Sequence, residues 1–149
     1  MSRKSLLFVC MVLPLLIFLW GCPVKSQLIA YCEDEALDED RYAIWKNIAI
    51  DKTGRVYSYI NLTHWDGHYE LEILLMTMDG FTAYDNGNNF NAWHTSVYTK
   101  CRQSFEFPNV PPGNYAVVVD NTDSGWKSTD FDFENDYAVF DLKVYHESY

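Results

Sequence analysis

The sequence lacks the motifs that mark the common catalytic and nucleotide-binding sites. No G-x-S-x-G nucleophile turn and no glycine-rich phosphate loop occurs in its 149 residues. His94 and His146 have no recognisable neighbours that would make either of them a catalytic base. The chain is therefore expected not to be an enzyme, and a metal-dependent hydrolase is the catalytic alternative that stays open.

Basic residues are scarce. Lysine and arginine number 11 against 21 aspartates and glutamates, which gives a formal net charge of -10. Such a charge opposes binding to nucleic acid and to anionic lipid surfaces. Nucleic acid is thus excluded as an expected partner, and membrane contact is expected only through the N-terminal leader.

Amphipathic helical patterns are also missing, apart from one expected helical turn from Phe81 to Tyr84. Aromatic residues make up 17% of the chain, and they favour strands. From residue 42 onward, apolar and polar residues alternate between turns rich in Gly, Pro, Asn and Asp. The fold class is therefore predicted to be all-β, an antiparallel β-sandwich of about seven or eight strands over residues 42–149.

The stretch from Phe105 to Thr122 is expected to supply the centre of this sandwich. After a proline-glycine turn, Tyr115, Val117 and Val119 point to one side of a strand, and the residues between them are apolar too. A strand that is apolar on both faces belongs inside a sheet rather than at its edge.

The dipeptide Asp66-Gly67 predicts a two-residue hairpin turn between the strands that flank it. This turn would set Leu62 opposite Leu71, so that the apolar side chains of both strands share one face. The other face would carry polar and aromatic side chains, among them Tyr57, Tyr59, Asn61 and Trp65.

The N-terminus has the pattern of a secretory signal peptide, predicted over residues 1–26. Its apolar run from Leu6 to Trp20 is about 15 residues long, shorter than the roughly 20 that a spanning helix needs. Residues 19–22 resemble a bacterial or archaeal lipobox, which would place a lipid on Cys22. The alternative is cleavage after Ser26, which would release the protein. In both cases the protein is predicted to be secreted or otherwise extracytoplasmic.

Two further features follow the leader. Residues 27–41 include six carboxylates within the eight positions 33–40, and they are predicted to form an acidic linker. Cys32 and Cys101 are the cysteines that remain after the leader. Because an exported chain meets an oxidising compartment, these two are predicted to form a disulfide bond, with two buried thiols as the alternative.

Aromatic side chains are the main candidates for a binding site. Five of them, outward on a strand or in the long loops, could form a platform for a sugar or a peptide: Tyr57, Tyr59, Trp65, Trp93 and Trp126. Packing beneath a neighbouring loop is the alternative. The expected function is a non-catalytic interaction or ligand-binding module at the cell envelope or outside the cell, with a carbohydrate-binding module as the runner-up. The expected partner is a protein or a glycan at the cell surface.

The last long loop suggests one cofactor. It is rich in carboxylates, the ligands that calcium prefers, and the candidate set is Asp120, Asp123, Asp130 and Asp132. Acidic loops are also expected on any chain of this charge, so calcium stays an open alternative to no cofactor at all. Asn61 begins an Asn-Leu-Thr sequon and would accept a glycan in a host that glycosylates exported proteins.

Several short motifs resemble those of a known group of domains. They are Leu74–Asp79, Tyr84–Gly87, Pro111–Tyr115 and Val119–Thr122, the last two reading PPGNY and VDNT. In this order they resemble exported archaeal and bacterial β-sandwich domains, and more distantly pre-peptidase C-terminal and GOLD-like domains. The resemblance covers roughly residues 56–125. It implies a β-sandwich and a non-catalytic module, with no functional residues to carry over.

Overall fold

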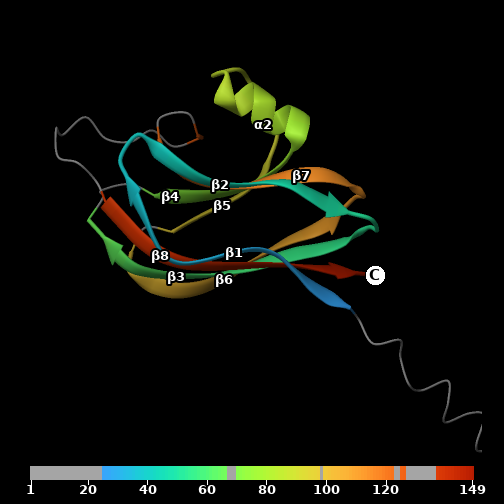
Figure 1. Ribbon diagram of the computed structural model, residues 1–149, viewed down its shortest axis with the longest axis horizontal. Coiled ribbons are helices and arrows are strands. Elements are labelled where there is room, and N and C mark those ends of the chain that lie inside the picture. The colour runs from blue at the N-terminus through green and yellow to red at the C-terminus, as the bar shows by residue number, and fades with distance from the viewer. Residues whose placement is uncertain (1–24, 67–69, 98, 123–124, 127–136) are drawn as a thin grey trace, which may run out of the picture.

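The computed structural model describes residues 25–66, 70–97, 99–122, 125–126 and 137–149. Two four-stranded antiparallel sheets pack face to face, with one short helix on the outside of one of them (Figure 1). The predicted β-sandwich is therefore confirmed.

Sheet A has the strand order β1-β8-β3-β6, made of β1 (Ser26–Asp38), β8 (Tyr137–Ser148), β3 (Gly54–Trp65) and β6 (Cys101–Val110). Sheet B has the order β2-β7-β4-β5, made of β2 (Arg41–Ile50), β7 (Gly113–Asn121), β4 (Leu71–Thr77) and β5 (Trp93–Val97). Every neighbouring pair in both sheets is antiparallel.

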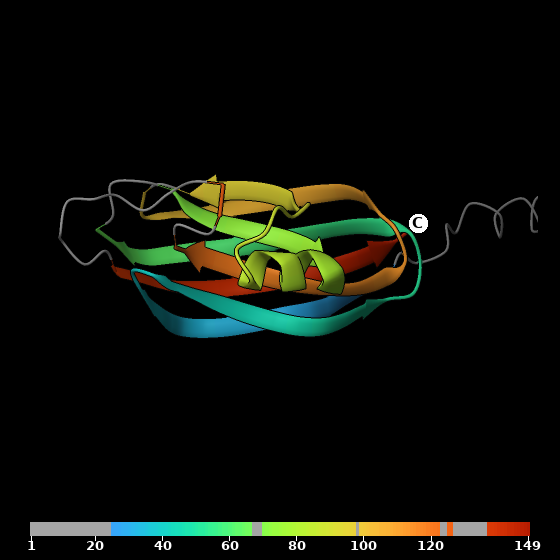
Figure 2. The same ribbon diagram turned by 90° about the horizontal axis from the view of Figure 1, so that it is seen from above.

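Helix α2 (Met78–Asp85) lies across the outer face of sheet B, as the view from above shows (Figure 2). Its N-cap is Thr77, whose hydroxyl accepts a hydrogen bond from the Gly80 N–H at 3.1 Å. The helix extends the single turn that the sequence predicts. Within the described ranges, no helix is long and apolar enough to cross a membrane.

Strand β7 lies inside sheet B, between β2 and β4, as predicted. Tyr115, Val117 and Val119 face the core between the sheets, where they meet side chains such as Ile60 and Phe140 of sheet A. On the opposite side of β7, Ala116 and Val118 form a second cluster with Leu74 and Met76 of β4 and with Phe81 and Tyr84 of α2. The two-sided apolar pattern reflects a sheet that is covered on both faces.

The predicted hairpin between β3 and β4 is wrong, because these two strands belong to different sheets. Leu62 and Leu71 both point into the core, as expected, but they reach it from opposite sheets. Two strands that each carry one apolar face can bury these faces in two ways. They can pair side by side in one sheet, or they can lie in two sheets that pack face to face. The Asp66 carboxylate accepts a hydrogen bond from the Tyr137 N–H at 2.6 Å, so it ties the end of β3 to the start of β8.

Residues 27–41 do not form a linker, which corrects a second prediction. Most of this segment is strand β1, an edge strand paired with β8. Its carboxylates point largely to solvent, whereas Ala30 and Leu37 are buried in the core. Asp34 adopts a left-handed backbone conformation, with φ 49°, where the register shifts between Cys32 and Glu35. The acidic composition therefore marks an edge strand. Residues 1–24 of the predicted leader, Cys22 among them, lie outside the described residues.

The predicted disulfide is also wrong, because Cys32 and Cys101 are both free. Cys32 lies on β1 and Cys101 on β6, which are the two opposite edges of sheet A. Strands β8 and β3 separate them, a distance of about 14 Å at the usual strand spacing, whereas a disulfide needs Cα atoms within about 7 Å. Burial raises the pKa of the Cys32 thiol to about 11, which keeps it protonated at neutral pH.

Candidate functional site

The outer faces of the two sheets differ in what covers them. Helix α2 lies over sheet B, whereas no described element lies over the outer face of sheet A (Figure 1). We call this surface the open face; it is formed by the outward side chains of β3, β6 and β8, which are Arg55, Tyr57, Tyr59, Asn61, Arg102, Ser104, Glu106, Asp141, Lys143, Tyr145 and Glu147.

Three tyrosines form the centre of the open face. Tyr57 and Tyr59 project from β3 because alternate residues of this strand, such as Val56 and Ile60, are buried in the core. Tyr145 of β8 stacks on Tyr57, with ring centroids 5.2 Å apart and an interplanar angle of 13°. Tyr59 meets both rings edge-on and remains 52% exposed. Mutual packing holds the rings in fixed orientations while leaving Tyr59 available to a ligand.

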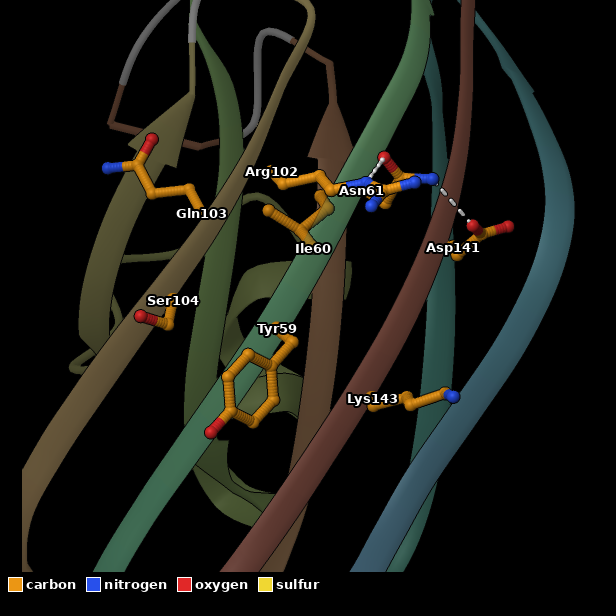
Figure 3. Close-up of a pocket in the computed structure, with 8 residues that line it drawn as sticks. All are labelled: Tyr59, Ile60, Asn61, Arg102, Gln103, Ser104, Asp141 and Lys143. Carbon is orange, nitrogen blue, oxygen red and sulfur yellow. Dashed lines mark hydrogen bonds between the residues drawn. The ribbon is translucent and has the colours of Figure 1, made fainter.

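A shallow hollow of about 360 Å³ lies on one side of Tyr59 (Figure 3). We call it the Asn61 hollow. Arg102 donates from Nε to Asn61 Oδ1 at 3.1 Å, and Asn61 donates from Nδ2 to Asp141 Oδ2 at 2.8 Å. The Asp34 N–H also donates to Asp141, and these hydrogen bonds lower the pKa of the Asp141 carboxyl. The row of planar polar groups is thereby fixed across β6, β3 and β8.

A second hollow of about 440 Å³ lies on the other side of Tyr59. We call it the Arg55 hollow. The Arg55 guanidinium forms ion pairs with Glu106, at 3.3 Å, and with Glu147. The guanidinium also lies over the Tyr57 ring, with Cζ 5.6 Å from the centroid. Both hollows are lined by Tyr59 and by Ser104, so they meet at these two residues.

The described residues hold a second polar cluster, beneath the opposite surface of the sandwich. Glu72 of β4 and Asp120 of β7 are direct cross-strand partners and are each 1% exposed. His94 of β5 places Nε2 2.6 Å from Glu72 Oε1, and the Thr122 N–H donates to Asp120 Oδ1 at 3.0 Å. Burial, and secondarily the charge of Glu72, raise the pKa of Asp120 to about 6. We call Glu72 and Asp120 the acidic pair.

Gly125 and Trp126 lie next to the acidic pair and its neighbour His94. The Trp126 ring stacks on Phe90, with centroids 5.8 Å apart and an angle of 5°, and meets His94 edge-on at 4.8 Å. A Cβ atom at Gly125 would overlap the carboxylates of the pair, so the backbone of this segment packs directly on them. The acidic pair is therefore a packed interior feature rather than an accessible cleft.

A calcium site is not formed by the residues that the structure describes. They contain no group of three or more His, Cys, Asp or Glu side chains arranged to hold a metal ion. Of the predicted ligands, Asp120 belongs to the acidic pair, whereas Asp123, Asp130 and Asp132 lie outside the described residues.

The five predicted aromatic residues do not form one platform. Only Tyr57 and Tyr59 come together. Trp65 points into the core and is 9% exposed. The register shifts between Leu62 and His64, where two residues of β3 lie opposite one residue of β8. After this bulge, the side chains of β3 point to the opposite faces from those that simple alternation predicts. Trp93 is half-buried against Tyr115, and Trp126 lies over the outer face of the other sheet.

Sequence reasoning missed Tyr145, Glu72 and His94. The alternation of the last strand, which puts Phe140 and Leu142 inward, carried the signal that would have placed Tyr145 outward. Glu72 interrupts an otherwise apolar run from Leu71 to Met76, but no local pattern indicates a partner on another strand. Asn61 projects outward as predicted, and both ends of its amide are hydrogen-bonded to neighbouring side chains.

The fold and the open face thus define a β-sandwich in which one sheet is covered by a helix and the other presents an ordered aromatic and polar surface. Neither a protein-family model nor a curated protein matches this sequence.

Proposed function

We propose that the protein is a non-catalytic, exported binding module that holds a carbohydrate on the open face of sheet A. The observation that carries this proposal is the tyrosine cluster, in which the exposed ring of Tyr59 lies between two polar hollows. The placement outside the cytoplasm rests on the predicted leader. The resemblance to exported sandwich domains supports the same class of protein.

A sugar ring combines the two kinds of surface that the open face offers. The C–H groups of a pyranose form apolar patches that pack on an aromatic ring, and the hydroxyl groups at its edge hydrogen-bond to planar polar side chains. Tyr59 supplies the ring, and Asn61 and Asp141 supply polar groups whose positions are fixed by hydrogen bonds. Preorganised groups of this kind lose little conformational entropy when a ligand binds.

The tyrosine cluster also distinguishes this surface from the acidic pair. Tyr59 is 52% exposed, whereas Glu72 and Asp120 are 1% exposed and lie against the backbone at Gly125. A ligand can reach the open face without any rearrangement of the described strands. This accessibility favours binding at sheet A over chemistry at the acidic pair.

The proposal is tested by binding of the purified protein to a panel of polysaccharides and oligosaccharides, followed by calorimetry on each binder. The Tyr59→Ala variant is expected to weaken binding about tenfold or more, as for a central aromatic contact of a binding site. Tyr59→Phe retains the ring and is expected to keep most of the affinity.

Trp126→Ala is the matched control, because Trp126 is an aromatic residue of similar exposure, 50%, that packs on Phe90 and His94 on the other side of the sandwich. It should bind like the unaltered protein. If no carbohydrate in the panel binds, or if Tyr59→Ala binds as tightly as the control, the proposed function is wrong. If the open face binds a protein in the absence of any glycan, protein binding would replace carbohydrate binding as the function of this surface.

A further inference from the structure

We infer that the ligand of the open face is an uncharged oligosaccharide chain that lies along β3 and occupies both hollows at once. This inference rests on the proposed function and specifies the substrate class of the same site. Two observations carry it, which are the continuity of the two hollows and the balance of charge along them.

The two hollows form one elongated site. They meet at Tyr59 and at Ser104, which are cross-strand partners on β3 and β6. Since serine is small, the surface on the β6 side of the Tyr59 ring is not blocked. The site extends along β3 from Arg55 to Asn61, a distance of about 20 Å at the usual rise per residue. This length exceeds a single pyranose ring and suits several in a row.

The charges that line the site balance one another. Each hollow contains both signs, and together they hold three cations and three anions: Arg55, Arg102 and Lys143 against Glu106, Asp141 and Glu147. In the Arg55 hollow, the guanidinium is already paired with two carboxylates. In the Asn61 hollow, Lys143 and Arg102 act on the Asp141 carboxyl and contribute to its lowered pKa.

This balance selects against charged ligands. A uronic acid or sulfated sugar would have to displace Glu106 or Glu147 from Arg55, on a protein whose net charge of -10 already repels anions. A cationic sugar would compete with Arg102 and Lys143 for Asp141. An uncharged chain uses the same groups as hydrogen-bond donors and acceptors without breaking an ion pair.

The test measures the affinity of the full mature protein for two ladders of oligosaccharides, from monosaccharide to hexasaccharide. One ladder is built from the neutral sugar that binds in the panel and the other from its uronic acid. For the neutral ladder, affinity is expected to rise about tenfold or more from the disaccharide to the longer chains and then to level off when both hollows are filled. It is expected to change less than about twofold between low and high salt, because no net charge is neutralised.

Two variants at the junction of the hollows isolate the chain-length effect. Ser104→Trp places a large side chain beside Tyr59 and is expected to remove the gain with length, so that the longest and the shortest binders have equal affinity for this variant. Ser104→Ala keeps the passage open and should retain the rise of affinity with chain length.

Three results would overturn the inference while leaving the proposed function intact. They are equal affinity for the shortest and longest chains, tighter binding of the uronic acid ladder with a steep salt dependence, and unchanged chain-length dependence in Ser104→Trp. Failure of every sugar to bind would instead contradict the proposed function and the inference together.

Discussion

Folding stability is expected to rise as the pH falls from 8 toward 5, with Asp120 contributing about 1.4 kcal/mol over this range for a pKa raised from 3.8 to about 6. Since the folded state binds this proton more tightly than the unfolded chain does, the stabilisation appears as the pH falls through 6. Above that pH, Asp120 is ionised beside Glu72, and both carboxylates are buried. The groups that face Asp120 from other elements are Glu72, Tyr84 and Tyr42, with His94 on the far side of Glu72.

Two other carboxylates, those of Asp66 and Asp141, limit the gain in folding stability at lower pH. Hydrogen bonds lower the pKa of Asp66 and of Asp141, so their contributions are present above their unfolded pKa and are lost as the pH falls through their folded values. Maximum stability is therefore expected in mildly acidic solution, below pH 6 and above the range in which these two carboxylates are protonated.

The Asp120→Asn variant separates this effect from the others. An asparagine can still accept the hydrogen bond from the Thr122 N–H, but it carries no charge toward Glu72. We expect Asp120→Asn to exceed the unaltered protein in unfolding free energy by about 1–3 kcal/mol at pH 8, and we expect this difference to shrink by about 1 kcal/mol at pH 5. Urea unfolding at the two pH values measures both differences. Asp51→Asn, at an exposed carboxylate, is the control, and an equal response of the two variants would contradict the assignment.

Replacing Gly54 by alanine is expected to lower the free energy of unfolding by about 3 kcal/mol, at the upper end of the usual cost of overpacking. Gly54 begins β3 and is buried between Val110 of β6 and Ser148 of β8. A Cβ atom there would overlap the carbonyl oxygen of Glu147 and lie 2.6 Å from Nε2 of His146. Because the first of these neighbours is backbone, relief would require β3 and β8 to move apart.

Gly87→Ala provides the matched comparison for Gly54→Ala. Gly87 has a φ of 66° and nothing within 4 Å of an added Cβ atom, so the substitution strains the backbone without creating a clash. We expect it to cost about 1 kcal/mol. Urea unfolding of both variants measures the two losses of unfolding free energy. A cost for Gly54→Ala no larger than that for Gly87→Ala would mean that β3 and β8 do not approach each other as closely as described.

Local sequence patterns were sufficient to predict the sandwich and its central strand. The alternation in β8 and the two-sided apolar run of β7 are set by which faces are buried, and burial leaves a direct trace in the order of residues. The helical turn around Phe81 could also be predicted from local sequence, because the segment that contains it is polar and follows directly on a buried strand. Each of these features depends on residues that are close together in the chain.

Features that depend on strand order could not be predicted. Leu62 and Leu71 fit equally well a hairpin and two strands that pack from opposite sheets, and only the placement of β4 in the second sheet decides between them. The even number of cysteines and the predicted oxidising compartment favoured a disulfide bond between Cys32 and Cys101. The distance between these two residues, however, is set by the two strands that lie between them. Trp65 was misplaced because a one-residue bulge reverses the alternation and leaves no mark in the sequence.

The candidate site shows the same division. Tyr57 and Tyr59 were predicted on the correct face because they alternate with buried residues of one strand. Their contacts with Tyr145 and the meeting of the two hollows at Ser104 join β3 to β8 and β6, strands that lie far apart in the sequence. The sequence therefore predicted the residues that β3 contributes to the site, but not the contributions of β6 and β8.

The most direct test of carbohydrate binding on the open face is an NMR titration of the isotope-labelled protein with a neutral oligosaccharide that binds it. The account predicts chemical-shift changes concentrated on β3, β6 and β8, largest at Tyr57, Tyr59, Ser104 and Lys143. Changes centred on His94 and Trp126, on the other side of the sandwich, would contradict it.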